Sequence, residues 1–304
     1  MSRFNKRIVC CYLHPITKYG YPPPASGTID YLTEMMQLGF QAIELEGIRE
    51  QHLLEVFDQK ELIKDKLEAL GLEVPYFCTV LPGLSHEDKD TRKHNLELFQ
   101  KGCEIASTFG ALGVLDNGPL PPWIFPKDIP IVRHYEEEVL AQASISNRLN
   151  WDRYWEDLIE TYQIICDIAA TYDLTYQIHP AKGVLAANAD GFLNLAKAVN
   201  RPNLRFNFDT ANLFAVHENL QLSLIRLADH IDYIHISDNR GIHTEHLPIG
   251  DGKIKWNLLF ETLNRIGFSG HLGIDIGGAE SGVLDLDQAY MDSAVFISEQ
   301  YNLS

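Results

Sequence analysis

The sequence lacks the features that mark several large classes of protein. Its five cysteines form no Cys-x-x-Cys pair, so they indicate small buried side chains rather than a metal finger or a disulfide framework. It has no apolar run of about 18 residues, the length that a membrane-spanning helix needs. The amino-terminal segment also lacks the long apolar stretch of a signal peptide. We therefore expect a cytoplasmic protein without a membrane partner.

Positive charge is scarce as well. The 304 residues include 25 Lys and Arg against 42 Asp and Glu, which gives a net charge of −17. Such a chain repels a phosphate backbone, and no basic cluster resembles a nucleic-acid footprint. We therefore expect no nucleic-acid partner. Hydrophobic residues make up 45% of the chain and charged residues 22%, as in an ordinary soluble globule.

Short apolar, β-branched runs recur along the chain and alternate with segments of helical periodicity. The runs begin near residues 7, 40, 73, 111, 174, 204, 231 and 271. Six of the seven intervals suit one strand, one loop and one helix. Helices are predicted over 28–39, 60–70, 88–109, 151–171, 189–198, 218–228, 256–266 and 285–300. Eight strands followed by eight helices predict an α/β fold, a (β/α)8 TIM barrel that occupies residues 1–304 as a single domain.

The remaining interval, between the fourth and fifth strands, is too long for an ordinary crossover. It contains a proline-rich stretch at 118–130 and continues to about residue 150. An insertion at about 117–150 leaves the carboxyl end of a barrel strand, where active sites of this fold lie. We expect it to form a lid or an oligomer arm, and a packed excursion without a substrate role is the alternative.

Four strand-like runs in the second half of the chain end in side chains that can bind a metal. These are His179, Asp209, the pair His235 and Asp238, and Asp275. Parallel strands joined by helical crossovers run the same way, so their ends meet at one rim of the sheet. We place function at that rim.

The motifs around these positions resemble the sugar isomerase/epimerase superfamily of xylose-isomerase-like barrels, which is related to apurinic endonucleases of the same fold. They read Gln177-Ile-His-Pro, Phe208-Asp-Thr-Ala-Asn, His235-Ile-Ser-Asp, His246-Leu-Pro-Ile-Gly-Asp-Gly and Gly273-Ile-Asp. The resemblance covers nearly the whole chain and is most specific in its carboxyl-terminal half. Relatives often form dimers or tetramers, so a homo-oligomer is one expectation that the sequence leaves open.

The resemblance implies a divalent metal site. It places Gln177, Asp209, His235 and Asp275 at ligand positions that the family usually fills with Glu, Asp, His and Glu. Oxygen donors with one imidazole suit Mn²⁺ first, and Mg²⁺, Co²⁺ or Zn²⁺ as alternatives. Because only two of the four positions carry a carboxylate, we expect weaker metal binding or recruitment of His179 or His246 as an extra ligand.

The altered position 177 affects the chemistry. In the family's epimerases, two carboxylates at the Gln177 and Asp275 positions exchange a proton with opposite sides of a substrate carbon. An amide cannot act as a base. If the chain is catalytic, Asp275 is the remaining carboxylate of the catalytic pair, and His179 is the alternative acid or base.

Further polar residues near the rim are predicted to contact the substrate. In relatives, the loop after the seventh strand presents such groups, which here are Asp238, Arg240 and His246. Glu44 and Glu46 alternate with apolar residues and share one face of the second strand. Of this pair we assign Glu44 to the substrate, with buried hydrogen bonding as the alternative. His14, at the end of the first strand, completes the set.

The leading hypothesis is a metal-dependent isomerase or epimerase that removes a proton next to the carbonyl of a sugar, keto-sugar or cyclitol. A lyase or dehydratase of the same fold needs one base and tolerates Gln177 better. A non-catalytic sugar-binding barrel is the rival from another class. Cleavage of abasic DNA is disfavoured by the negative charge and by Asn212, where the nuclease relatives carry a histidine.

Overall fold

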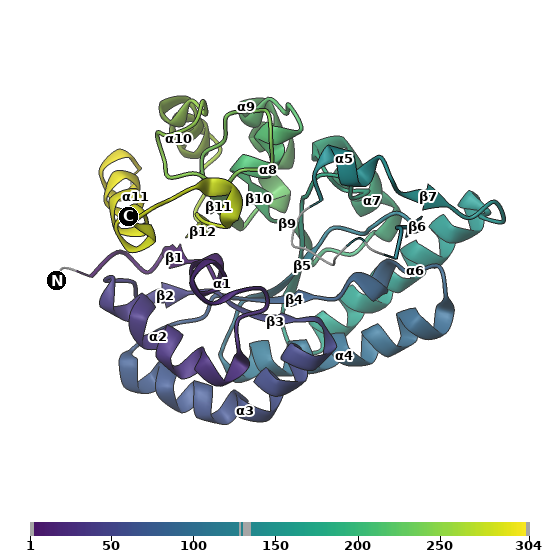
Figure 1. Cartoon of the computed structure of the whole chain (residues 1–304), viewed down its shortest axis with the longest axis horizontal. Helices are drawn as coiled ribbons and strands as arrows, with labels where there is room; N and C mark the ends of the chain where they lie inside the picture. Colours follow the sequence, from purple (N-terminus) through teal and green to yellow (C-terminus); the bar gives the residue numbers. More distant parts are fainter. Residues whose placement is uncertain (1–2, 128, 130–134, 302–304) are drawn as a thin grey trace.

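A closed ring of parallel strands forms the centre of the molecule in the computed structural model, which describes residues 3–127, 129 and 135–301 (Figure 1). Hydrogen bonds join the strands into two five-stranded sheets, ordered β10-β11-β12-β1-β2 and β3-β4-β5-β8-β9. The strands are β1 (Ile8–Cys10), β2 (Ala42–Ile43), β3 (Leu45–Ile48), β4 (Tyr76–Val80), β5 (Gly113–Asn117), β8 (Thr175–His179), β9 (Leu204–Phe206), β10 (Phe208–Asp209), β11 (Tyr233–Ile236) and β12 (His271–Ile274).

Two barrel strands are interrupted by one residue each. Glu44 separates β2 from β3, and Asn207 separates β9 from β10. The ladder continues through both interruptions, because the Glu44 N–H donates to the carbonyl of Cys10 and the Asn207 N–H donates to that of Ile178. Each interrupted pair is therefore one barrel strand, and the ring in the described residues has eight. This confirms the predicted (β/α)8 barrel.

Helices surround the ring, and most of them begin where an Asp or Asn side chain caps the first turn. The crossover helices lie close to their predicted positions, except that α3 starts at Arg49 rather than near residue 60. The helices around the ring are α1 (Leu13–Tyr19), α2 (Thr28–Gln37), α3 (Arg49–Leu70), α4 (Lys89–Thr108), α6 (Trp151–Ala170), α7 (Ala189–Val199), α8 (Thr210–Ala215), α9 (Leu220–Leu227), α10 (Trp256–Arg265) and α11 (Leu286–Gln300). The short helices α1 and α8 were not predicted. No helix in the described ranges is long and apolar enough to cross a membrane.

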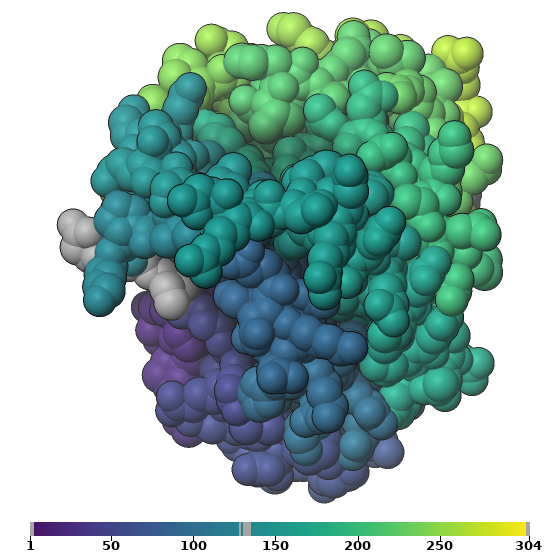
Figure 2. All heavy atoms as spheres, turned by 90° about the vertical axis from the view of Figure 1, so that its right-hand side faces the viewer, coloured from purple at the N-terminus to yellow at the C-terminus, as the bar shows by residue number. Residues whose placement is uncertain are grey.

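The insertion after β5 contains a small antiparallel pair, β6 (Trp123–Ile124) with β7 (Ser144–Ile145), and the short helix α5 (Glu137–Leu140). Figure 2 shows this teal segment lying across the face between the blue and the green parts of the chain. It is tied to the barrel by Ser85, whose hydroxyl accepts a hydrogen bond from the Leu120 N–H at 3.0 Å. Tyr154 donates to the carbonyls of Ser85 and Leu120, at 2.9 and 3.0 Å.

Candidate metal centre and active site

Five ionisable side chains meet at the carboxyl ends of the barrel strands. Each of them is at most 4% exposed. His179 ends β8, Asp209 ends β10, His235 lies in β11, Asp275 follows β12 and His246 belongs to the loop after β11. This rim is the part of the fold in which barrel enzymes place their catalytic groups. We call these five residues the donor cluster.

The donor atoms form two overlapping groups of three, His179 with Asp209 and His235, and Asp209 with His246 and Asp275, and within each group all atoms lie within 4.8 Å of one another. Asp209 Oδ2 lies 3.7 Å from His179 Nε2, 3.9 Å from His235 Nδ1 and 3.8 Å from His246 Nε2. Asp275 Oδ2 lies 3.8 Å from His235 Nδ1 and 3.6 Å from His246 Nε2. These distances exceed a hydrogen bond. They are close to the roughly 3.4 Å that separates ligands bound tetrahedrally to one ion at about 2.1 Å.

Hydrogen bonds on the far side of Asp209 and His235 turn one atom of each toward the other donors. Asp209 Oδ1 accepts from the Asn212 N–H at 2.7 Å as the cap of α8. His235 Nε2 donates to Glu44 Oε2 at 2.9 Å. Asp209 Oδ2 and His235 Nδ1 are buried and have no hydrogen-bond partner among the described residues. Two buried acceptors of this kind fit a metal ion.

His179 is oriented in the same way. Its Nδ1–H donates a hydrogen bond to Asn207 Oδ1 at 2.9 Å, so the lone pair of the ring lies on Nε2. The amide of Asn212 lies 3.1 Å from Nε2 and donates to it. A metal bound at this nitrogen would replace that contact. Polar partners that fix the ring of a ligating histidine in this manner also raise its basicity.

The electrostatics of the donor cluster favour ionised aspartate. Burial would raise the pKa of Asp209, but His246, His179 and His235 outweigh it and hold that pKa well below its usual range. Burial lowers the pKa of His179, which keeps the ring neutral. For His235, burial is outweighed by Glu44 and the two aspartates, which raise its pKa to about 9. Binding of a metal there would release a proton.

His246 reaches the donor cluster because its loop folds back over the rim. Leu247 pairs with Asp238, and His246 pairs with Gly277, both in antiparallel bridges. The Gly277 N–H donates to the carbonyl of His246 at 3.0 Å. His246 was expected to bind substrate or serve as an extra ligand, and its place beside Asp209 and Asp275 favours the second role.

The assignment of Gln177 as a metal ligand and catalytic position needs correction. Its amide donates to Asp232 Oδ1 at 2.6 Å. Asp232 precedes β11, so the side chain of Gln177 points toward the amino ends of the strands, away from the rim. His179, two residues later on the same face of β8, lies at the rim in its place.

Two loop residues that were predicted to bind substrate have structural partners instead. Asp238 is buried, and its carboxylate accepts hydrogen bonds from three backbone N–H groups and from Trp256 Nε1, which fixes the loop after β11. Arg240 pairs with Glu245 at 2.7 Å, and its side chain is 48% exposed. Neither residue lines the cleft beside the donor cluster.

The other two predicted substrate contacts also lie behind the rim. His14 Nε2 is 2.6 Å from Asp287 Oδ1 of α11, and its ring packs edge-on against Tyr290. Glu44 accepts from Tyr233 and His235, so it orients the His235 ring, and it does not line the cleft. Both side chains are fully buried. The alternative of buried hydrogen bonding therefore describes Glu44.

Glu46 is the carboxylate of this strand that lines the cleft. The cleft holds about 30 Å³ and is bordered by Glu46, His179, His235 and Asp275. Glu44 and Glu46 share one face of the interrupted strand, and Glu46 is one step nearer the carboxyl end. Sequence periodicity predicts that both residues lie on this face, but it does not predict which of them reaches the cleft. A cleft that joins a half-buried carboxylate to a cluster of metal donors can support proton transfer.

Comparison with known proteins identifies the family. The family model described as a xylose isomerase-like TIM barrel matches residues 32–299. The chain belongs to this family. A putative L-ribulose-5-phosphate 3-epimerase, UlaE, of Shigella dysenteriae is 23% identical over 240 residues, which are 77% of this chain and 76% of that protein.

Solved structures show that this member shares the fold of sugar epimerases. D-allulose 3-epimerase from Methylomonas sp., in complex with D-allulose, superposes with a TM-score of 0.74 at 16% identity and covers 99% of both chains. The 3-keto-D-glucoside 4-epimerase YcjR of E. coli gives a TM-score of 0.72 at 16% identity, covering 97% of this chain and 100% of that one.

Proposed function

We propose that this protein is a divalent-metal-dependent sugar epimerase or isomerase that moves a proton at the carbon next to the carbonyl of a keto-sugar. The observation that carries the proposal is the donor cluster, which shares one cleft with Glu46. UlaE, the Methylomonas enzyme and YcjR are all named as epimerases, and the first two as 3-epimerases. Their names support the class of reaction.

The donor cluster fits a transition metal better than Mg²⁺. It offers three imidazoles and two carboxylates, whereas Mg²⁺ prefers oxygen ligands and bound water. We therefore propose Mn²⁺, Co²⁺ or Zn²⁺, held by His179, Asp209, His235 and Asp275 with His246 beside them. A bound ion would polarise the substrate carbonyl and stabilise negative charge on its oxygen.

Two carboxylates of this chain are placed to handle the substrate proton. Glu46 comes from β3 and Asp275 follows β12, and both line the cleft. Glu46 belongs to none of the groups of donors that could hold one ion among the described residues. We propose that Glu46 exchanges the proton from one side of the substrate carbon and Asp275 from the other. His179 then acts as a ligand rather than as the base.

Solvent exchange tests this function directly. The metal-loaded protein would be incubated in D2O with a panel of keto-sugars, and NMR would follow deuterium at the carbon next to the carbonyl. An epimerase gives a labelled epimer without loss of water. A lyase gives a dehydrated product, and absence of exchange across the panel would support a non-catalytic barrel.

Metal content provides the control for that panel. Elemental analysis after incubation with Mn²⁺, Co²⁺ or Zn²⁺ should find about one ion per chain. Asp209→Ala should lose both the ion and the exchange. If Asp209→Ala retains the ion with unchanged affinity, the proposed site is wrong.

A further inference from the structure

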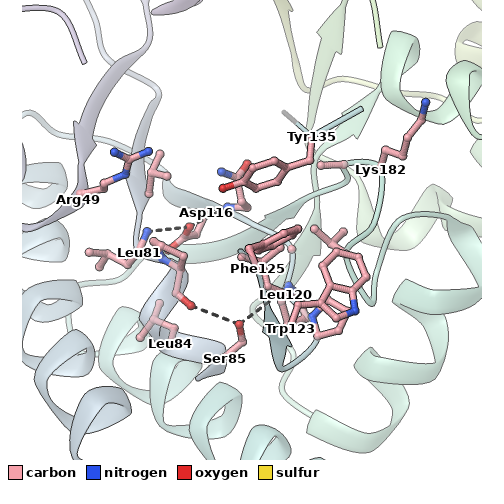
Figure 3. A pocket seen from close by; sticks show the side chains of 18 of the residues that line it. Arg49, Leu81, Leu84, Ser85, Asp116, Leu120, Trp123, Phe125, Tyr135 and Lys182 are labelled. Atoms are coloured by element: carbon pink, nitrogen blue, oxygen red, sulfur yellow. Dashed lines mark hydrogen bonds between the residues drawn. The ribbon is translucent and has the colours of Figure 1, made fainter. Parts of the chain in front are cut away.

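A second, larger cavity opens beside the cleft of the donor cluster. It holds about 280 Å³, against about 30 Å³ for the cleft. Tyr21, Val80 and Asn117 line both, so the two spaces are neighbours. Figure 3 shows the cavity and the side chains around it. We call this second space the aromatic cavity.

One wall of the aromatic cavity is built by the insertion. The rings of Phe125 and Tyr135 stack with their centroids 4.8 Å apart and their planes at 24°. The ring of Trp123 meets Phe125 edge-on, at 5.9 Å and 82°. Leu81 and Leu84, from the segment after β4, also line the space. In Figure 3 these leucines lie on the other side of the cavity from the three rings.

The backbone near the end of β8 makes room for this wall. Gly183 has a φ of 87°, and a Cβ built there would lie 2.8 Å from the ring of Trp123. Only glycine accommodates both that backbone and the close approach of the ring. Together with the hydrogen bonds of Ser85 and Tyr154 to the segment of Leu120, this contact holds the insertion in place.

The cavity is poor in positive charge. Lys182 lines it, but its ammonium group pairs with Glu136 at 3.6 Å. Arg49 has a left-handed backbone with a φ of 58°, and its guanidinium lies 5.4 Å from the ring centroid of Tyr21. A phosphate group is usually held by several charged or backbone donors. One arginine beside three aromatic rings and two leucines suits an apolar group with a polar edge better than a phosphate.

We infer that the aromatic cavity binds the aglycone of a glycoside, a ring-shaped apolar substituent carried by the sugar that reaches the donor cluster. This inference rests on the proposed function and names its substrate class. A free monosaccharide would leave Trp123, Phe125 and Tyr135 in contact with water, whereas a ring in the cavity stacks on them. Arg49 would hold a hydroxyl or carbonyl oxygen of the substituent.

Equilibrium binding of two unreactive glycosides, with a sugar phosphate for comparison, tests the inference. Phenyl β-D-glucoside, methyl β-D-glucoside and glucose 6-phosphate would be titrated into the full-length, metal-loaded protein and followed by calorimetry. We expect the phenyl glycoside to bind about tenfold tighter than the methyl glycoside, because its ring buries apolar surface. Equal affinities, or tightest binding of the phosphate, would overturn the inference.

Substitutions in the aromatic wall of the cavity test where the phenyl ring of the glycoside binds. Phe125→Ala should remove most of the preference for the phenyl glycoside and leave the methyl glycoside unaffected. Ile124→Ala is the matched control, because Ile124 directly precedes Phe125, is 51% exposed and does not line the cavity. If Phe125→Ala lowers the affinity for both glycosides equally, or if Ile124→Ala lowers the phenyl preference as much as Phe125→Ala does, the phenyl ring does not occupy the aromatic cavity.

These results separate the two proposals. Deuterium exchange with simple keto-sugars, combined with equal binding of the phenyl and methyl glycosides, would reject the aglycone site and keep the epimerase. A clear phenyl preference without exchange in any keto-sugar or keto-glycoside would keep the site and reject the epimerase.

Discussion

Glu44 and His235 form a carboxylate–imidazole pair at the base of the donor cluster. Glu44 Oε2 accepts a hydrogen bond from His235 Nε2 at 2.9 Å, and both side chains are buried. The same oxygen accepts from the hydroxyl of Tyr233 at 3.0 Å. The pair fixes the ring so that His235 Nδ1 faces Asp209 and Asp275.

Glu44→Gln should weaken metal binding because the amide holds the imidazole less firmly and does not raise its basicity. Loss of such a supporting partner typically costs about 10- to 100-fold in metal affinity. Competition with a chromophoric chelator measures the affinity. Glu61→Gln, an exposed change on α3, should have no effect. An unchanged affinity in Glu44→Gln would show that the pair does not support a ligand.

His179 and Gln177 offer a paired test on one strand. His179→Ala should lower metal affinity by about 100-fold or more, because it removes a donor. Gln177→Ala should leave that affinity within a few-fold of the wild type, although the loss of the contact with Asp232 should cost about 1–3 kcal/mol of stability. Thermal unfolding and chelator competition separate the two effects. The reverse pattern would restore Gln177 as the ligand.

Glu46→Gln should stop epimerisation without removing the metal, because exchange from its side of the substrate carbon is lost while Asp275 can still exchange the proton on the other side. Loss of a positioned acid or base lowers the rate by about 10²- to 10⁴-fold. The bound ion, measured by elemental analysis, should remain because Glu46 is not among the proposed ligands. Glu61→Gln again serves as the carboxylate control. Unchanged epimerisation in Glu46→Gln would assign the proton on that side to another group.

Asp116 should make folding stability depend on pH. Burial raises its pKa to about 8, although the N–H groups of Leu81 and Asn117 and the hydroxyl of Thr79 act against it. Between about pH 4 and pH 8, Asp116 is therefore protonated in the folded chain but ionised in the unfolded chain. The associated stability is fully present below pH 4 and is lost as the pH rises through 8, at up to about 1.4 kcal/mol per pH unit.

Asp116→Asn isolates this contribution. The amide oxygen can accept from Leu81 and Asn117 as Oδ1 does, while its NH2 group can donate to Thr79 Oγ1. The free energy of unfolding, measured by chemical denaturation, should fall less between pH 5 and pH 8 in the variant than in the wild type. Equal losses in the two proteins would mean that Asp116 is ionised in the folded chain at both values.

The barrel and most of its rim were predictable from the sequence alone. Eight strand-like runs at regular spacing favour a closed parallel ring, and the polar residues that end the runs are then expected to gather at one end of it. Asp209, His235 and Asp275 follow from that argument and lie together in the structure. The insertion after the fourth strand was also visible in the sequence.

How deep each side chain lies depends on how the strands pack around the barrel. Alternation along a strand assigns a residue to a face, but residues two apart share that face. Glu44 and Glu46, and likewise Gln177 and His179, are such pairs. The stagger of the strands around the barrel sets which member reaches the rim. The fold-back of the loop that carries His246 and the stacking of Phe125 on Tyr135 depend on contacts between distant segments, which local pattern does not encode.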